Sequence, residues 1–171
     1  MDGQSGLKIL YTNIQSVNNK INELRAVISS ERPDVVAITE SWTNENIDDK
    51  CLKVEGYDMV VRKDRVDTVG GRGGGILIYV KGMYVWKEDN ESTFNQCAKL
   101  NVKKRSGEFG ICVVYRSPNS DRDNDMMICQ WIREMRGDNI ILGDFNLESS
   151  GILAVLMQGE SHSMRHAPMP F

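Results

Sequence analysis

The sequence lacks the signatures of several large classes of protein. Its four cysteines are scattered and form no Cys-x-x-Cys pair, which fits neither a zinc site nor a secreted disulfide framework. The first six residues are polar and lack the apolar segment of a signal peptide. No apolar run is long enough to cross a bilayer. These absences predict an intracellular, soluble protein with reduced thiols and no membrane partner, and they are compatible with the nucleus.

The charge of the chain is small but unevenly distributed. With 21 basic and 24 acidic residues the formal net charge is −3, which by itself does not predict binding to nucleic acid. Residues 31–58 contain eight acidic and three basic side chains, whereas residues 62–105 contain ten basic and five acidic ones. This division would allow a basic face to meet phosphates while an acidic pocket holds a cation. The length of 171 residues fits one domain with a real core.

Apolar periodicity predicts regular structure through most of the chain. Residues 7–11 read as a strand, residues 19–31 have apolar side chains at helical spacing, and residues 34–39 form a second buried strand. This strand–helix–strand order predicts a parallel crossover. Further strands are expected at 59–62, 76–80, 84–87, 97–103, 109–115 and 139–144, and a second amphipathic helix is expected at 124–136.

This order of elements predicts an α/β fold of two sheets with helices outside. Residues 1–6 are expected to be disordered, residues 7–147 to form the folded domain, and residues 148–171 to form an irregular tail with no clear strand after 152–157.

The most informative stretch is residues 140–147, Ile-Ile-Leu-Gly-Asp-Phe-Asn-Leu. Its three leading apolar residues predict a strand buried on both faces. Because residues two apart in a strand point to the same face, Asp144 and Asn146 can project together from its end. A carboxylate can take a proton from water, and an amide can hold the attacked group. The alternative is a strand followed by an Asx turn, which this stretch alone favours.

A glycine cluster at residues 70–75, Gly-Gly-Arg-Gly-Gly-Gly, resembles a phosphate cradle at first sight. It lacks the lysine and hydroxyl residues of a P-loop, and it leads into a strand instead of a helix. The sequence therefore favours a flexible turn or bulge at this position.

Five polar residues fall at the ends of predicted strands, where ligands of α/β sheets gather. Glu40 can hold Mg²⁺, which prefers oxygen ligands, and Asp144 can orient or deprotonate an attacking water. Tyr115, Asn13 and Asn146 can donate hydrogen bonds to the non-bridging oxygens of a phosphate. Residues of these types suit the hydrolysis of a phosphodiester.

Four segments of the sequence occur in the order found in the endonuclease/exonuclease/phosphatase superfamily. The chain resembles above all the endonuclease domain of LINE-type, non-LTR retrotransposon reverse transcriptase polyproteins, and Arg-Gly-Gly-Gly-Ile at residues 72–76 also fits that branch. The resemblance covers roughly residues 7–147. The four segments are Tyr-Thr-Asn-Ile-Gln-Ser at 11–16, Ile-Thr-Glu-Ser-Trp at 38–42, Val-Tyr-Arg-Ser-Pro at 114–118 and Leu-Gly-Asp-Phe-Asn-Leu at 142–147.

The resemblance implies a four-layer α/β sandwich, incomplete at its C-terminal end, and cleavage of DNA that depends on Mg²⁺ or Mn²⁺ and on no small-molecule cofactor. It implies that Glu40 binds the metal and that Asp144 and Asn146 serve the water and the phosphate. It also implies that Asn13 and Tyr115 support the site.

The sequence departs from the family after residue 146. Members of the family carry a further aspartate and a late Ser-Asp-His motif, whereas no aspartate follows Asp144 here, and His162 and His166 lie in Ser-His-Ser and Arg-His-Ala. The resemblance therefore implies weak or absent cleavage. Neither histidine follows a strand signal or has an aspartate nearby, so both are expected to be exposed in the tail. Missing late strands would also leave a sheet edge unpaired, which predicts self-association.

Two alternatives stay open at this point. The chain could be a catalytically dead remnant that serves as a nucleic-acid-binding or interaction module. It could also be an inositol-phosphate or lipid phosphatase of the same superfamily, although the retrotransposon-like motifs argue against that reading.

Overall fold

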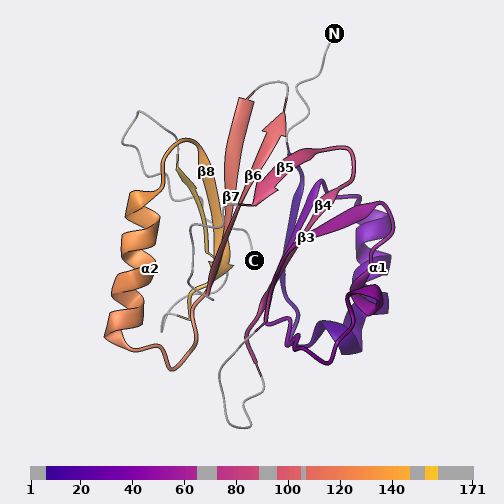
Figure 1. The fold of residues 1–171 in the computed structure, drawn as a ribbon, viewed down its shortest axis with the longest axis horizontal. Helices are drawn as coiled ribbons and strands as arrows, with labels where there is room; N and C mark the ends of the chain where they lie inside the picture. The colour runs from indigo at the N-terminus through magenta and orange to yellow at the C-terminus, as the bar shows by residue number, and fades with distance from the viewer. Residues whose placement is uncertain (1–6, 65–72, 89–95, 105–106, 147–152, 158–171) are drawn as a thin grey trace.

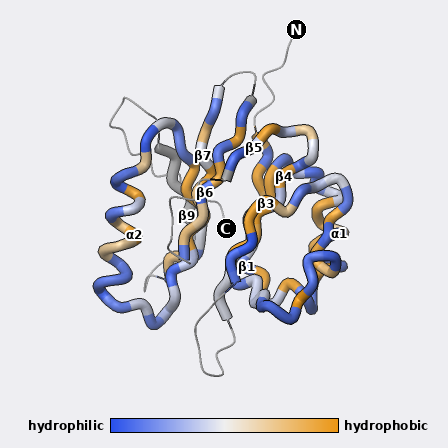
Figure 2. Tube along the Cα trace, in the orientation of Figure 1, coloured by the Kyte–Doolittle hydropathy of each residue, from blue (hydrophilic) through white to orange (hydrophobic). Residues whose placement is uncertain are grey.

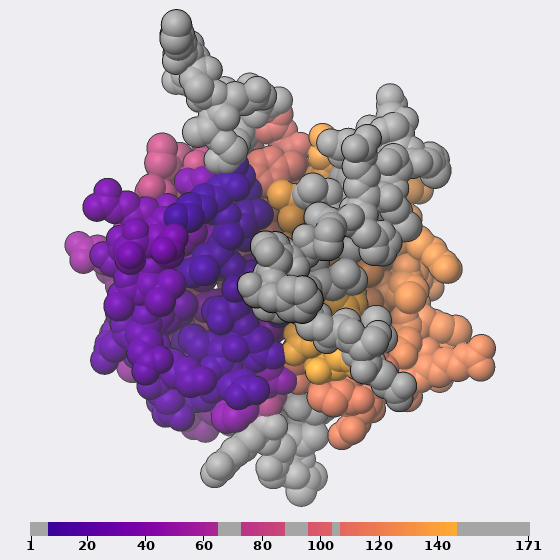
Figure 3. All heavy atoms as spheres, turned by 180° about the vertical axis from the view of Figure 1, so that it is seen from behind, coloured from indigo at the N-terminus to yellow at the C-terminus, as the bar shows by residue number. Residues whose placement is uncertain are grey.

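Two β-sheets packed face to face form the centre of the molecule, and a helix covers the outer face of each (Figure 1). The computed structural model describes residues 7–64, 73–88, 96–104, 107–146 and 153–157. Seen from behind, the N-terminal and C-terminal halves of the chain occupy opposite sides (Figure 3). The expected four-layer α/β sandwich is therefore confirmed.

The first sheet, here called the N-terminal sheet, has the strand order β1-β2-β4-β3. Strands β1 and β2 are parallel, and the other two pairs are antiparallel. Helix α1 is the crossover between β1 and β2, as the strand–helix–strand pattern predicts. The elements are β1 (Ile9–Asn13), α1 (Val17–Glu31), β2 (Val35–Thr39), the short 3₁₀ helix η1 (Asp49–Leu52), β3 (Tyr57–Lys63) and β4 (Ile76–Lys81).

The second sheet, here called the C-terminal sheet, has the order β5-β6-β7-β8-β9. Strands β7 and β8 are parallel and are joined through helix α2, whereas the other pairs are antiparallel. The elements are β5 (Val85–Glu88), β6 (Cys97–Lys104), β7 (Gly107–Tyr115), α2 (Arg122–Glu134), β8 (Asn139–Asp144) and β9 (Leu153–Met157).

Strand β2 is a continuous apolar run because both of its faces are buried. All five of its residues are buried, because alternate side chains serve different layers. Val35 and Ala37 pack between the two sheets, whereas Val36 and Ile38 pack under helix α1. A third apolar cluster lies between the C-terminal sheet and α2 and includes the buried Cys97 and Cys112. The orange strands in Figure 2 mark these apolar layers.

Helix α1 ends where the sequence requires it to end. Arg32 adopts a left-handed conformation with φ 49°, and its N–H donates to the carbonyl oxygen of Ile28 at 2.8 Å. Pro33 follows and cannot continue the helix. Within the described part of the chain, no helix has the length and apolar character needed to span a bilayer.

Strand β9 lies beyond residue 147, where the sequence placed the end of the domain. It pairs antiparallel with β8 from Asn139 opposite Met157 to Gly143 opposite Leu153, and so it covers the outer edge of β8. The outermost described strands are then β1 and β3 in one sheet and β5 and β9 in the other. Self-association through an unpaired edge stays a prediction. The rest of the expected tail, residues 158–171, lies outside the described residues, as do residues 1–6.

Candidate functional site

The five residues that the sequence singles out come from the ends of four strands. Asn13 is the last residue of β1 and lies opposite Thr39, the last residue of the neighbouring strand β2. Glu40 is the next residue after Thr39. Tyr115 and Asp144 are partners at the ends of the parallel strands β7 and β8, and Asn146 lies two residues further on. The two sheets thus bring these strand ends to the same edge of the molecule.

A hydrogen bond between the sheets joins the two groups of strand ends. The Asn13 amide Nδ2 donates to Asp144 Oδ2 at 2.6 Å, although the residues are 131 positions apart in sequence. The backbone N–H of Asn146 donates to Asp144 Oδ1 at 3.1 Å, which is the Asx-type turn that the sequence offered as an alternative. The turn is therefore present in the structure, and the catalytic reading of this stretch stays a prediction. The Asn13 amide oxygen, Oδ1, is buried and has no hydrogen-bond partner among the described residues.

The Glu40 carboxylate is held by two donors on one of its oxygens. Glu40 Oε2 accepts a hydrogen bond from the Trp42 indole Nε1 at 2.5 Å and another from the backbone N–H of Gly74 at 2.7 Å. The second oxygen, Oε1, accepts no hydrogen bond from the described residues. The carboxylate is therefore fixed in orientation and keeps one oxygen available for a ligand.

The described part of the glycine cluster, residues 73–75, has a more specific role than the expected turn. Ser41 and Trp42 donate backbone hydrogen bonds to the carbonyl oxygens of Gly75 and Gly74, at 3.3 and 2.9 Å. At Gly75 φ is +90°, and a Cβ atom there would overlap Ser41 Oγ. These glycines clamp the segment that carries Glu40. Sequence reasoning missed Trp42 and Gly74, although Trp42 stood inside a recognised motif.

Left-handed backbone conformations gather around this edge. Of the six described non-glycine residues with positive φ, five follow β1, β2 or β8, and the sixth is the helix-ending Arg32. Such conformations cost about 1 kcal/mol or more each and persist where the surroundings hold them, commonly at functional sites. The clustering is thus an independent sign of a site. The five are Gln15, Ser16, Glu40, Trp42 and Asn146.

Arg116 fixes the position of Asn146. The Asn146 Nδ2 amide donates to the carbonyl oxygen of Arg116 at 2.6 Å, and Arg116 Nη1 donates to the carbonyl oxygen of Asn146 at 3.1 Å. The guanidinium also binds both carboxylate oxygens of Asp125 on α2, at 2.6 and 3.1 Å. This contact lowers the pKa of Asp125 below its ordinary value. One amide hydrogen of Asn146 is thus used internally, and the second makes no hydrogen bond to the described residues.

The pKa of Tyr11 is affected by both carboxylates of the site, Asp144 and Glu40. Its phenol group is hydrogen-bonded to Thr39 Oγ1 at 2.8 Å. Burial raises the pKa of Tyr11 to about 12, and the negative charges of Asp144 and Glu40 contribute to the rise. The Tyr11 phenol therefore stays neutral over the physiological pH range.

The shifted pKa of Tyr11 predicts a loss of stability at high pH. Between pH 10 and 12 the unfolded phenol ionises while the folded one keeps its proton, so the free energy of unfolding falls as pH rises. Tyr11→Phe is expected to reduce this fall by about 2 kcal/mol, allowing for partial exposure. Urea unfolding at pH 10 and pH 12 measures the difference. Parallel pH profiles for both proteins would show that the Tyr11 phenol is not shielded.

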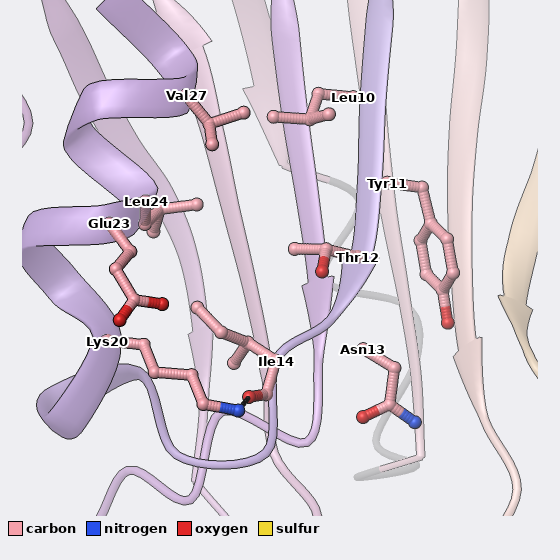
Figure 4. A pocket seen from close by; sticks show the side chains of 9 residues that line it. All are labelled: Leu10, Tyr11, Thr12, Asn13, Ile14, Lys20, Glu23, Leu24 and Val27. Atoms are coloured by element: carbon pink, nitrogen blue, oxygen red, sulfur yellow. Dashed lines mark hydrogen bonds between the residues drawn. The ribbon is translucent and has the colours of Figure 1, made fainter.

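A cavity of about 270 Å³ opens beside the Glu40 carboxylate and the mostly buried Tyr115. A separate cavity of about 310 Å³ lies between β1 and α1. Figure 4 shows that Tyr11 and Asn13 lie on the side of β1 away from α1, so strand β1 separates them from the helix. The lining of the first cavity comprises Gln15, Glu40, Trp42, Gly73, Tyr115, Ser117, Pro118 and Asn119.

Two oxygen atoms at this edge are candidate ligands for a hard cation. Glu40 Oε1 and Asn13 Oδ1 are oxygen atoms without a hydrogen-bond partner among the described residues. No group of three or more Asp, Glu, His or Cys that could hold a metal occurs in that part of the chain. Mg²⁺ is commonly bound by one or two carboxylates, with waters and substrate phosphates as its other ligands, and this donor set fits that mode. His162 and His166 lie outside the described residues.

Comparison with solved structures identifies several similar folds. The endonuclease domain of TRAS1, a telomere-specific non-LTR retrotransposon, has a TM-score of 0.65 and 16% identity, over 84% of this chain and 62% of that one. The AP endonuclease LMAP from Leishmania major has a TM-score of 0.65 and 14% identity, with coverages of 85% and 59%. The 3′ phosphatase NExo from Neisseria, bound to a product DNA hairpin, has a TM-score of 0.56 and 14% identity, with coverages of 85% and 60%.

This chain therefore spans less than two thirds of the length of each of these structures. Identities this low establish the fold alone. No curated protein sequence matches the chain. A family model, however, matches residues 10–163, which is most of the sequence. The match and the four-layer fold together show that the chain belongs to the Endonuclease/Exonuclease/phosphatase family.

Proposed function

We propose that this chain is a phosphodiesterase domain of the retrotransposon endonuclease type, which binds DNA and Mg²⁺ or Mn²⁺ and cleaves weakly or not at all. The convergence of Asn13, Glu40 and Asp144 at one edge between the sheets carries the proposal. Fold similarity to the TRAS1 endonuclease domain and to AP endonucleases supports a DNA substrate.

Each residue takes a role that its contacts allow. Glu40 offers Oε1 to the metal, because Trp42 and Gly74 hold its other oxygen. Mg²⁺ bound there would neutralise charge on the non-bridging phosphate oxygens. Asp144 accepts one hydrogen bond on each carboxylate oxygen, and each oxygen keeps a second lone pair that can orient a water molecule.

Asn13 and Asn146 act as donors to the phosphate in this proposal. Each uses one amide hydrogen internally, towards Asp144 or the Arg116 carbonyl, and has a second hydrogen to donate. Tyr115 lines the cavity beside Glu40 and supports the phosphate from the C-terminal sheet. Because these groups are already fixed, binding a phosphate costs little side-chain ordering.

Weak cleavage is expected of the site as the described residues form it. No imidazole lies among the described residues of the site, and no aspartate occurs after Asp144. A site with a metal ligand and phosphate donors but no general acid–base imidazole would bind the substrate better than it would hydrolyse it. The alternative of a catalytically dead binding module differs from this proposal only in degree.

A plasmid-nicking time course tests the proposal. With Mn²⁺, the full chain is expected to convert supercoiled plasmid little faster than the same reaction with EDTA. Asp144→Ala and the His162→Ala/His166→Ala double variant are expected to be indistinguishable from wild type. Robust wild-type cleavage that is lost in both variants would contradict this expectation and place the tail in the active site.

The same samples can be tested for the phosphatase alternative. Inorganic phosphate release from an inositol phosphate, faster than nicking and lost in Asp144→Ala, would favour a phosphatase over a nuclease. No feature of the described residues favours that outcome over a polymeric substrate.

A further inference from the structure

A second concave region lies at the opposite end of the N-terminal sheet. It is a cavity of about 910 Å³ between the C-terminal half of α1, helix η1 and the adjoining ends of β3 and β4. Five cationic side chains line it, and Glu55 is the one carboxylate among its described lining residues. The cations are Arg25, Arg32, Lys50, Lys53 and Lys81, and together with Glu55 they define what is here called the basic pocket.

The basic pocket is distinct from the candidate site. In the pairing of β2 with β4, Thr39 at the candidate site lies opposite Ile76, whereas Val35 at the other end lies opposite Val80. Lys81 follows Val80, so the whole length of β2 separates the two regions. At about 3.3 Å per residue this is on the order of 13 Å.

The cations of the basic pocket make no ion pair among the described residues. Arg25 donates to the carbonyl oxygens of Cys51 and Lys53, at 2.8 to 3.0 Å, and makes no ion pair among the described residues. Two nearby carboxylates are already paired elsewhere. Glu31 pairs with Lys8 at 2.8 Å, and Asp49 pairs with Arg62 at 2.5 Å.

The other four cations of the pocket make no ion pair among the described residues either. The pocket therefore combines one guanidinium fixed by backbone carbonyls with four cations that are free to move towards a ligand. Five positive charges against one negative charge, in a concave site, attract a compact anion with several oxygens. Phosphate groups have this chemistry, and the volume exceeds what a single phosphate needs.

We propose that the basic pocket is a second phosphate-binding site, which takes backbone phosphates of a nucleic acid strand away from the candidate cleavage site. The choice of nucleic acid rests on the proposed function, whereas the preference for phosphate rests on the pocket itself. The pocket would add affinity for the polymer without contributing to cleavage.

The test neutralises three pocket cations whose side chains make no ion pair in the described structure. The variant is Arg32→Gln/Lys53→Gln/Lys81→Gln. The matched control, Lys87→Gln/Lys103→Gln/Arg133→Gln, makes the same charge change at exposed positions on β5, β6 and α2. Anisotropy of a short labelled single-stranded oligonucleotide, measured in EDTA, reports binding without metal or cleavage.

The pocket variant is expected to bind at least about tenfold more weakly, with the slope of log K against log salt reduced by about 2 for three lost phosphate contacts. The control should change affinity less than about twofold. Equal weakening by both triple variants would overturn the proposal, because it would show general electrostatic attraction only. Poly-glutamate that competes as well as an oligonucleotide of equal charge would also overturn it.

A titration with pyrophosphate tests phosphate binding in the basic pocket separately from binding of the oligonucleotide. Amide NMR shifts at Gly56 and Tyr57 in wild type, lost in the pocket variant, would support the phosphate site, and their absence would overturn it. Shifts at these amides combined with unchanged oligonucleotide binding by the pocket variant would overturn the nucleic acid assignment. Neither the anisotropy in EDTA nor the NMR shifts depend on Mn²⁺ binding through Glu40. A failure to bind Mn²⁺ would therefore count against the proposed function and not against the basic pocket.

Discussion

Gly143→Ala is expected to lower the free energy of unfolding by about 3 kcal/mol or more. Gly143 lies in β8 beside β7, and a Cβ atom at this position would overlap the backbone carbonyl of Val114. The overlapping atoms are main-chain atoms in a paired strand, so no side chain can rotate away. The strands must separate, and the pairing that aligns Tyr115 with Asp144 is lost with them.

Gly137→Ala provides the matched control for this substitution. Gly137 has φ +77° after α2, and a Cβ atom there would meet nothing within 4 Å. Its expected cost is about 1 kcal/mol, from left-handed backbone strain alone. Urea unfolding followed by circular dichroism measures both variants. Similar losses in free energy of unfolding for the two variants would mean that the close approach of β7 and β8 does not require glycine at position 143.

Glu40→Gln is expected to weaken Mn²⁺ binding by at least about tenfold, which is about 1.4 kcal/mol. The amide oxygen of glutamine can still accept the hydrogen bonds from Trp42 and Gly74. The variant should therefore keep the local structure while replacing the available carboxylate oxygen with an amide nitrogen that cannot ligate the metal. Loss of the charge at residue 40 should also lower the pKa of Tyr11.

Glu45→Gln removes one negative charge from an exposed position a few residues away and serves as the control. Free Mn²⁺, followed by electron paramagnetic resonance during titration, gives the affinity of each protein. Equal affinities for wild type and Glu40→Gln would remove Glu40 from the metal site. A loss of equal size in both variants would indicate general attraction of cations instead of ligation.

Much of the fold could be predicted from the sequence because the signals are local. The apolar runs at 35–39 and 109–115 and the helical spacing at 21–28 each arise from which faces a segment buries. The strand ends that carry Asn13, Glu40, Tyr115 and Asp144 then follow from where the apolar runs stop. Within each sheet these ends meet because parallel strands end at the same edge. Their convergence across the two sheets also requires the sheets to pack with these edges together.

The features that could not be predicted depend on contacts between distant segments. The bond from Gly74 to Glu40 spans 34 positions, and nothing in Gly-Gly-Gly shows which carboxylate its N–H groups will meet. The pairing of β9 with β8 depends on a sheet edge that local patterns do not describe. The basic pocket combines residues from α1, η1, β3 and β4 and their connections, none of which is unusually basic on its own.

The separation of the two sheets along the chain has a consequence for the order of folding. The described strands of the N-terminal sheet come entirely from residues 9–81, and those of the C-terminal sheet come entirely from residues 85–157. Each sheet can therefore form from contacts within its own half of the chain, at a modest entropy of loop closure. The Asn13–Asp144 bond needs both halves already docked, so the candidate site should be among the last parts to assemble. Substitutions at that bond should accelerate unfolding and leave the folding rate almost unchanged.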